Sequence, residues 1–122
     1  MSAPTHEDAL ILLKLYEFGG DPHLSKSWNF VFSDHWVNDY TAFVAKFPAS
    51  SEEYGYFLHY AAWFELLGTL WKHKLINESL LFDWILIPPR WNRVAKFVEG
   101  YRASTGEPRM YENFEAMAKA GV

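Results

Sequence analysis

Apolar residues recur every three or four positions along much of this chain, a spacing that predicts helices rather than strands. The clearest run covers residues 52–73, preceded by Ser50 or Ser51 as a helix-capping residue. One face of this predicted helix carries Phe57, Tyr60, Phe64, Leu67 and Trp71. Gly68 lies in the same helix, where glycine costs roughly 1 kcal/mol relative to alanine. We therefore expect another helix to approach closely at Gly68.

Capping and breaking residues divide the rest of the N-terminal half. A helix over residues 6–18 follows Thr5, which with Asp8 resembles a capping box, and Gly19-Gly20 end it. Asp21-Pro22 then restarts the chain, because proline suits the first turn of a helix. Residues 23–47 follow a largely helical pattern, with a break expected near residues 33–34 or at Asn38.

Capping and helix-breaking residues also divide residues 77–122. Asn77 precedes an apolar run over residues 80–87, and Pro88-Pro89 are expected to end or kink that helix. Further helices are predicted over residues 90–103 and 111–120. With no period-two alternation, the pattern predicts an all-α fold: an irregular bundle of five or six helices in a single domain over residues 1–122.

Aromatic residues are unusually abundant in this predicted bundle. They make up 19% of the 122 residues, as six Trp, seven Tyr and ten Phe. Large aromatic side chains dominate the energetics of cores and of interfaces. We expect that a chain of this length does not bury them all, and that some line a pocket, a groove or an oligomer interface.

Charge and cysteine content exclude several classes of function. The net charge of −4 argues against a nucleic-acid partner, since such modules are usually basic. The absence of cysteine excludes disulfides, thiol nucleophiles and zinc–thiolate sites, and it fits a cytoplasmic protein. The apolar runs are interrupted by charges and are shorter than the roughly 20 residues that a membrane-spanning helix needs, so no membrane span is expected.

No catalytic, metal or cofactor motif is present in the sequence, so we predict no catalytic residue, no metal and no cofactor. His35 and Asp39 are four residues apart on a plausible helix, but two ligands do not make a metal site. His59 lies between Leu58 and Tyr60, where it could serve as a general base. A histidine packed among aromatics with one satisfied nitrogen is the favoured interpretation.

Glu65 is a carboxylate at the edge of an apolar helix. Such a group must be solvated or paired, because an isolated buried charge is very costly. Candidate partners are Arg90, Arg93 and Arg102, of which Arg102 is preferred because it continues an apolar helical line from Trp91. We therefore predict that Glu65 forms an interhelical clamp with Arg102 rather than acting as a catalytic acid.

Residues 57–120 resemble a family of uncharacterised prokaryotic helical proteins known as a domain of unknown function. The resemblance depends on an ordered set of residues: Phe64, Glu65, Gly68, Leu70, Leu75, Ile76, Trp91, Arg102, Pro108, Phe114 and Glu115. Within it, a Phe-Glu pair occurs twice. The resemblance implies a helical domain and supplies no activity.

Three functions remain open at this point. The leading hypothesis is a non-catalytic helical domain that binds another protein, beginning with itself as a homodimer, through aromatic surface. The alternative is a domain that binds a small apolar ligand in an aromatic-lined pocket. A remote alternative is a small hydrolase or isomerase that uses His59 or His35 with a carboxylate. The candidate ligand-binding residues are His59, Tyr60, Trp63, Glu65, Trp91 and Arg102.

Overall fold

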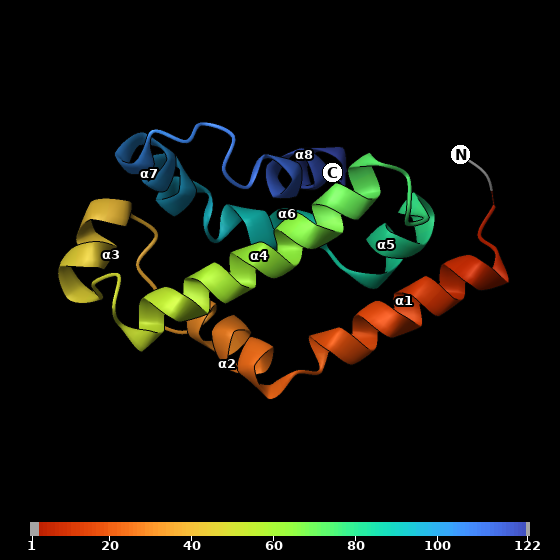
Figure 1. The fold of residues 1–122 in the computed structure, drawn as a ribbon, viewed down its shortest axis with the longest axis horizontal. Coiled ribbons are helices and arrows are strands. Elements are labelled where there is room, and N and C mark those ends of the chain that lie inside the picture. Colours follow the sequence, from red (N-terminus) through yellow and green to blue (C-terminus); the bar gives the residue numbers. More distant parts are fainter. Residues whose placement is uncertain (1–2, 122) are drawn as a thin grey trace.

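Helices are the regular secondary structure of residues 3–121, the part of the chain that the computed structural model describes. The remaining residues of the predicted domain, Met1, Ser2 and Val122, lie outside this part. The helices are α1 (His6–Gly19), α2 (Pro22–Val31), α3 (Tyr40–Lys46), α4 (Glu52–Lys72), α5 (Glu78–Trp84), α6 (Ile87–Asn92), α7 (Ala95–Thr105) and α8 (Glu112–Ala120) (Figure 1). The all-α class is confirmed, and these residues form eight helices rather than the expected five or six.

Two of the expected helices are each divided in two, which accounts for the difference in number. The predicted segment 23–47 becomes α2 and α3, and Asp39 starts α3 by accepting a hydrogen bond from the Ala42 N–H at 2.9 Å. The predicted segment 90–103 becomes α6 and α7, which Val94 separates. Pro88 and Pro89 lie in the first turn of α6, whereas α5 has already ended at Trp84. Proline lacks only an N–H that a first turn leaves unbonded, so these residues start a helix here rather than end one.

Side-chain caps fix several of the predicted helix starts. Thr5 and Asp8 form the expected capping box of α1. Ser51 caps α4 by accepting from the Tyr54 N–H, and Asn77 caps α5 by accepting from the Leu80 N–H, both at 3.1 Å. Each cap satisfies a backbone donor that the first turn of a helix leaves free.

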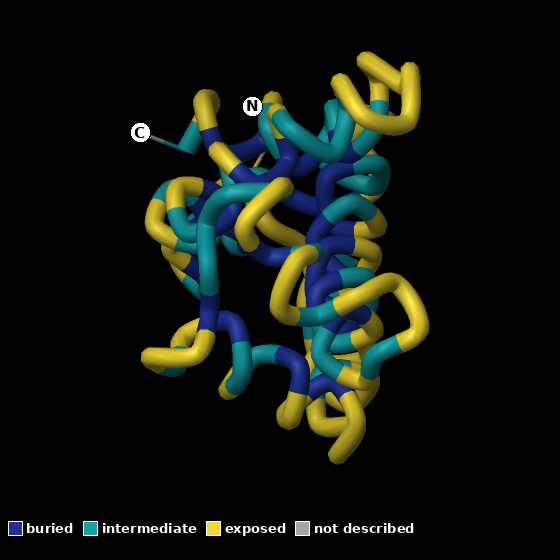
Figure 2. The backbone as a smooth tube through the Cα atoms, turned by 90° about the vertical axis from the view of Figure 1, so that its left-hand side faces the viewer, coloured by how far each residue is buried: buried dark blue, intermediate teal, exposed yellow. Residues whose placement is uncertain are grey.

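Helix α4 crosses the middle of the molecule and the other helices surround it (Figure 1). Helix α2 packs against one side of α4 and α8 against another, while α6 packs on α8. Helices α3 and α7 pack together towards the start of α4, and α1 packs against α5. Buried stretches occur in the helices and also in several connections between them, while exposed stretches lie on the outside (Figure 2). None of the helices in the described residues is long and apolar enough to span a bilayer.

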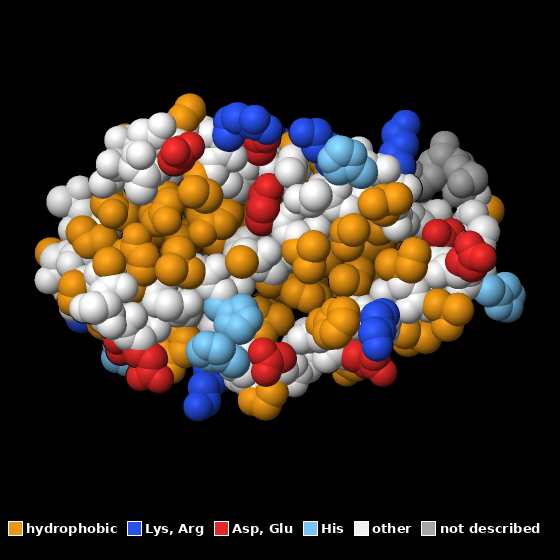
Figure 3. All heavy atoms as spheres, viewed as in Figure 1, with side chains coloured by type: hydrophobic (Ala, Val, Ile, Leu, Met, Phe, Trp, Pro, Cys, Tyr) orange, Lys and Arg blue, Asp and Glu red, His pale blue; other side chains and the backbone are white. Residues whose placement is uncertain are grey.

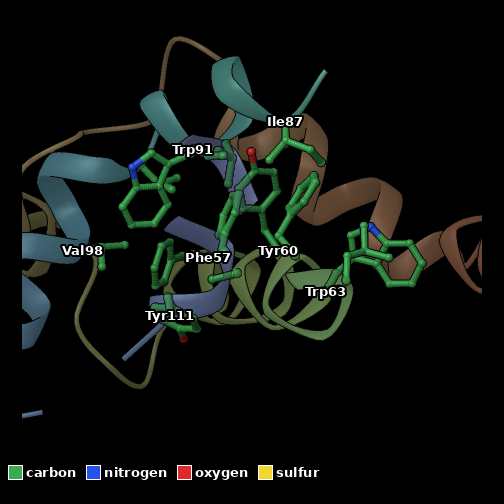
Figure 4. Packing of buried hydrophobic residues seen from close by; sticks show 14 of the residues in the cluster. Phe57, Tyr60, Trp63, Ile87, Trp91, Val98 and Tyr111 are labelled. Carbon is green, nitrogen blue, oxygen red and sulfur yellow. The ribbon is translucent and has the colours of Figure 1, made fainter. Parts of the chain in front are cut away.

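Aromatic side chains supply 11 of the 24 buried hydrophobic residues of the core in the described part of the chain (Figure 4). The fully buried ones are Phe43, Phe57, Tyr60, Phe64, Phe97 and Phe114. Their rings meet edge-on or offset, as for Phe57 and Phe97 with centroids 4.3 Å apart. Among the described aromatic residues, only Tyr16, Phe18 and Phe32 are classed as exposed. The surplus of exposed aromatic side chains expected from composition is therefore small, because rings from several helices fill one continuous core around α4.

Candidate functional site

Helix α8 approaches α4 most closely at Gly68. A Cβ atom on Gly68 would lie 2.5 Å from the carbonyl carbon and oxygen of Asn113 and 2.9 Å from the Phe114 nitrogen. Contacts this short do not occur between real atoms, so the two backbones can meet only because residue 68 has no side chain. The close helix approach expected at Gly68 is confirmed.

Glu65 lies one turn before Gly68 and binds the first turn of α8. Its Oε1 accepts hydrogen bonds from the backbone N–H groups of Asn113, at 3.1 Å, and Phe114, at 2.9 Å. Tyr111, the residue at the N-cap position of α8, has φ 59° and makes no side-chain cap. A carboxylate from α4 therefore supplies the cap of α8 and interacts favourably with the positive end of its dipole.

Arg102 is bound to a different carboxylate. Its Nη1 lies 3.0 Å from Oε1 of Glu115, and its Nε donates to the carbonyl oxygen of Met110 at 2.8 Å. Burial disfavours ionisation of Glu115, but the hydrogen bond and charge of Arg102, with those of Lys119, outweigh it and lower the pKa of the Glu115 carboxyl. The predicted pair between Glu65 and Arg102 is thus wrong. Glu65 binds backbone N–H groups of α8, and Arg102 binds Glu115 in the same helix.

Aromatic contacts complete this contact region. The rings of Phe64 and Phe114 stack with centroids 4.7 Å apart and an angle of 14° between their planes. Trp91 meets Phe114 edge-on at 5.1 Å, and the Arg102 guanidinium lies 5.8 Å from the Trp91 ring centroid. We call this region the α4–α8 junction, formed by Phe64, Glu65, Gly68, Trp91, Arg102, Phe114 and Glu115.

The six candidate ligand-binding residues do not form one site. Glu65, Trp91 and Arg102 meet at the junction, whereas Trp63 is buried well apart from Trp91 (Figure 4). Tyr60 is fully buried in the core and donates from its hydroxyl to the carbonyl oxygen of Arg90 at 2.9 Å. Burial raises the pKa of Tyr60, against the opposing effect of two nearby arginines.

His59 faces another histidine rather than a carboxylate. Its ring centroid is 4.7 Å from that of His23 in α2, with the two rings edge-on. Asp39 is used as the cap of α3, and His35 is exposed. Within residues 3–121, no group of three or more His, Cys, Asp and Glu side chains is arranged to hold a metal ion.

A hollow of about 540 Å³ lies elsewhere, near the turn between α4 and α5. Its lining differs from the predicted set and contains one aromatic residue: Asp8, Trp71, Lys72, Lys74, Ile76, Asn77 and Glu78. The Trp71 indole N–H donates to Glu78 at 3.0 Å within this lining. None of the six candidate residues lines this hollow.

Comparison with known proteins places the chain in a family. Residues 4–120 match the model of a family described as a domain of unknown function, DUF4760. The chain belongs to this family. The match includes α1 to α3, which the resemblance over residues 57–120 had not covered. No curated protein matches the chain, and no solved structure does so.

Seven of the eleven residues on which the resemblance to this DUF4760 family depends form the α4–α8 junction. Both Phe-Glu pairs are among them, and their rings stack on each other. Both carboxylates are bound by protein groups, Glu65 by backbone N–H groups and Glu115 by Arg102 and Lys119. The arrangement holds α8 on α4, which gives both carboxylates a structural role.

Sequence reasoning missed the partners at this junction for an identifiable reason. Glu115 is 13 positions from Arg102 in the printed sequence, across a loop whose path local spacing does not define. The other partners are backbone groups: the carbonyl of Met110 and the N–H groups of Asn113 and Phe114. Every residue has such groups, so the residue types in the sequence do not reveal which ones take part. The repeated Phe-Glu pair does not reveal them either, because Glu65 binds backbone N–H groups whereas Glu115 binds Arg102 and Lys119.

Proposed function

We propose that this DUF4760 chain is a non-catalytic domain that acts by binding protein, beginning with a second copy of itself, and that α1 provides the contact surface. The observation that supports this most strongly is the exposure of apolar side chains on α1. Leu10, Leu13, Tyr16 and Phe18 are exposed by 65%, 62%, 68% and 57%. The aromatic surface anticipated from composition is replaced in this proposal by a mixed aliphatic and aromatic one.

Helix α1 is unusual in exposing apolar residues on more than one side. Leu15 is buried and Leu12 partly buried against the core, whereas Leu13 and Tyr16 lie on one flank and Phe18 on the other, by helical spacing. Apolar side chains are accordingly visible where α1 lies on the face drawn in Figure 3. A helix that is apolar nearly all round is normally covered on most sides.

The charges on α1 are compatible with a second copy as the covering partner. Lys14 and Glu17 pair at 3.4 Å on the exposed side of the helix, and Glu7 and Asp8 add two further acids near its start. Because the surface carries both signs of charge, two copies can meet without uniform like-charge repulsion. A symmetric dimer is also the commonest closed assembly, and it lets one patch cover its own equivalent.

Sedimentation velocity over a range of protein concentrations tests this proposal. We expect the parent to dimerise and Leu13→Glu to weaken dimerisation by about tenfold or more, because a charge would replace a central apolar contact. The matched control is Leu86→Glu, which adds the same charge at a leucine that is 67% exposed outside α1. A parent that stays monomeric at high concentration would overturn the proposal and favour small-molecule binding.

A further inference from the structure

Arg90 has no acidic partner, although it is half-buried. Its side chain makes no hydrogen bond in the structure, and its Nε is buried without an acceptor. The guanidinium instead lies 5.7 Å from the Trp28 ring centroid and 5.8 Å from that of Phe32. Contacts with ring faces stabilise a cation, but they leave its N–H donors unused.

Arg93 adds a second positive charge at the same place. Its guanidinium lies 5.6 Å from the centroid of the same Phe32 ring. Arg90 and Arg93 are three residues apart in a helical stretch, a spacing that makes their side chains neighbours. Arg93 donates from Nε to the Val31 carbonyl oxygen and from Nη2 to that of Ser33, at 2.7 and 2.9 Å. These two hydrogen bonds hold the Arg93 guanidinium in position, and its Nη1 makes no hydrogen bond within the described residues.

The charges near this pair are not balanced by carboxylates. The ion pairs in residues 3–121 join Lys14 with Glu17, Arg102 with Glu115, Arg109 with Glu112 and Lys119 with Glu115. Neither Arg90 nor Arg93 takes part, although acidic residues outnumber Lys and Arg by 15 to 11 in the whole chain. Two guanidinium groups beside one ring therefore lack an ion-pair partner, and a bound anion would supply one.

We propose that Arg90 and Arg93 form a binding site for an oxyanion group, a phosphate or a carboxylate, carried by a small ligand. Guanidinium groups bind both kinds of group through paired N–H donors. Phe32 is 42% exposed, so the apolar ring beside the two arginines borders solvent, and because the Arg90 Nε is itself buried, the ligand would meet the terminal nitrogens of Arg90. This inference goes beyond protein binding through α1 and does not depend on it.

The arginine side chains themselves provide the readout. The chain has four arginines, Arg90, Arg93, Arg102 and Arg109, so a ¹H–¹⁵N spectrum of their Nε–H groups contains few signals. We expect the Arg90 signal to shift and saturate when inorganic phosphate or acetate is added at constant ionic strength, with a Kd of about 1 mM or tighter. Saturation with one anion alone assigns the site to that group, and saturation with both assigns it to oxyanions generally.

Substitutions separate a specific site from a general salt effect. Arg90→Gln should weaken binding by about tenfold or more, whereas Arg109→Gln removes the same charge from an exposed pair and should leave it unchanged. If Arg90→Gln fails to fold, the parent titration still decides the matter. Shifts that do not saturate with either anion, or that are equal at Arg90 and Arg109, would overturn the proposal.

Discussion

The two Phe-Glu dipeptides of this molecule, at residues 64–65 and 114–115, make different contacts. Phe64 and Phe114 stack on each other, but Glu65 lies in the middle of α4 whereas Glu115 lies in the first turn of α8. Glu65 accepts from backbone N–H groups of α8, while Glu115 pairs with Arg102. The identity of a carboxylate does not decide its partner. The partner depends on whether a helix start or a guanidinium lies opposite.

Replacing Glu65 tests its role as a cap. Glu65→Ala removes the acceptor of two backbone donors and should lower the free energy of unfolding by about 1–3 kcal/mol. Glu65→Gln keeps an acceptor oxygen without the charge and should lose less. Chemical denaturation measures both effects.

A double-mutant cycle should show strong coupling between Arg102 and Glu115 and weaker coupling between Arg102 and Glu65, and the reverse order would contradict the structure.

Two glycines of α4 provide a matched comparison. Gly68→Ala would force its Cβ against the Asn113 backbone, and the resulting strain should destabilise the protein by about 1–3 kcal/mol. Gly55→Ala adds the same methyl group where no atom lies within 4 Å, so it should stabilise by up to about 1 kcal/mol through helix propensity. Thermal unfolding of both variants gives the comparison. Equal effects at the two positions would show that the close approach of α8 is wrong.

At the scale of elements, the first turn of α8 is held twice, by Glu65 of α4 and by the ion pair between Glu115 and Arg102 of α7. The pair is mostly buried, with side chains exposed by 18% for Arg102 and 27% for Glu115. Its contribution should therefore lie between those of exposed pairs and fully buried pairs. The docking of α8 thus depends on two separate charged contacts.

The lowered pKa of Glu115 predicts how this docking varies with pH. A carboxyl whose pKa is lower in the folded state stabilises the protein above its unfolded value, near the ordinary 4.5, and the stabilisation is lost as pH falls. Glu115→Gln should reduce the free energy of unfolding by about 1–3 kcal/mol at pH 7.

The difference between parent and Glu115→Gln should shrink as pH falls below about 4.5. Urea denaturation at several pH values measures this difference. Arg109 with Glu112 is the exposed comparison, and Glu112→Gln should change stability far less at every pH. A parent-to-variant difference that stays constant down to pH 3 would contradict the role given to Glu115.

The sequence predicted those elements that local chemistry defines. Helix α4 and the caps at Thr5, Ser51 and Asn77 follow from apolar spacing and capping residues, and each is present. The start of α6 was missed because proline can end one helix or begin the next, and only packing decides between them. The cap of α8 was missed because its acceptor comes from a side chain 48 positions away.

At the scale of the whole molecule, apolar surface is distributed unevenly. Outside α1, every described aromatic side chain except Phe32 is buried or partly buried, whereas α1 leaves four large apolar residues more than half exposed. Helix α1 packs mainly on α5, so most of its surface faces away from the core (Figure 1). The central claim is that a second copy of the chain covers this helix.

Hydrogen–deuterium exchange at low and high protein concentration tests that claim most directly, because it locates the covered surface on the unmodified protein. We predict that amides in residues 6–19 exchange more slowly at the higher concentration, while amides at the α4–α8 junction, already buried in one copy, do not change. Exchange from residues 6–19 that is independent of concentration in a sample shown to be dimeric would contradict the claim, and it would place the interface elsewhere on the molecule.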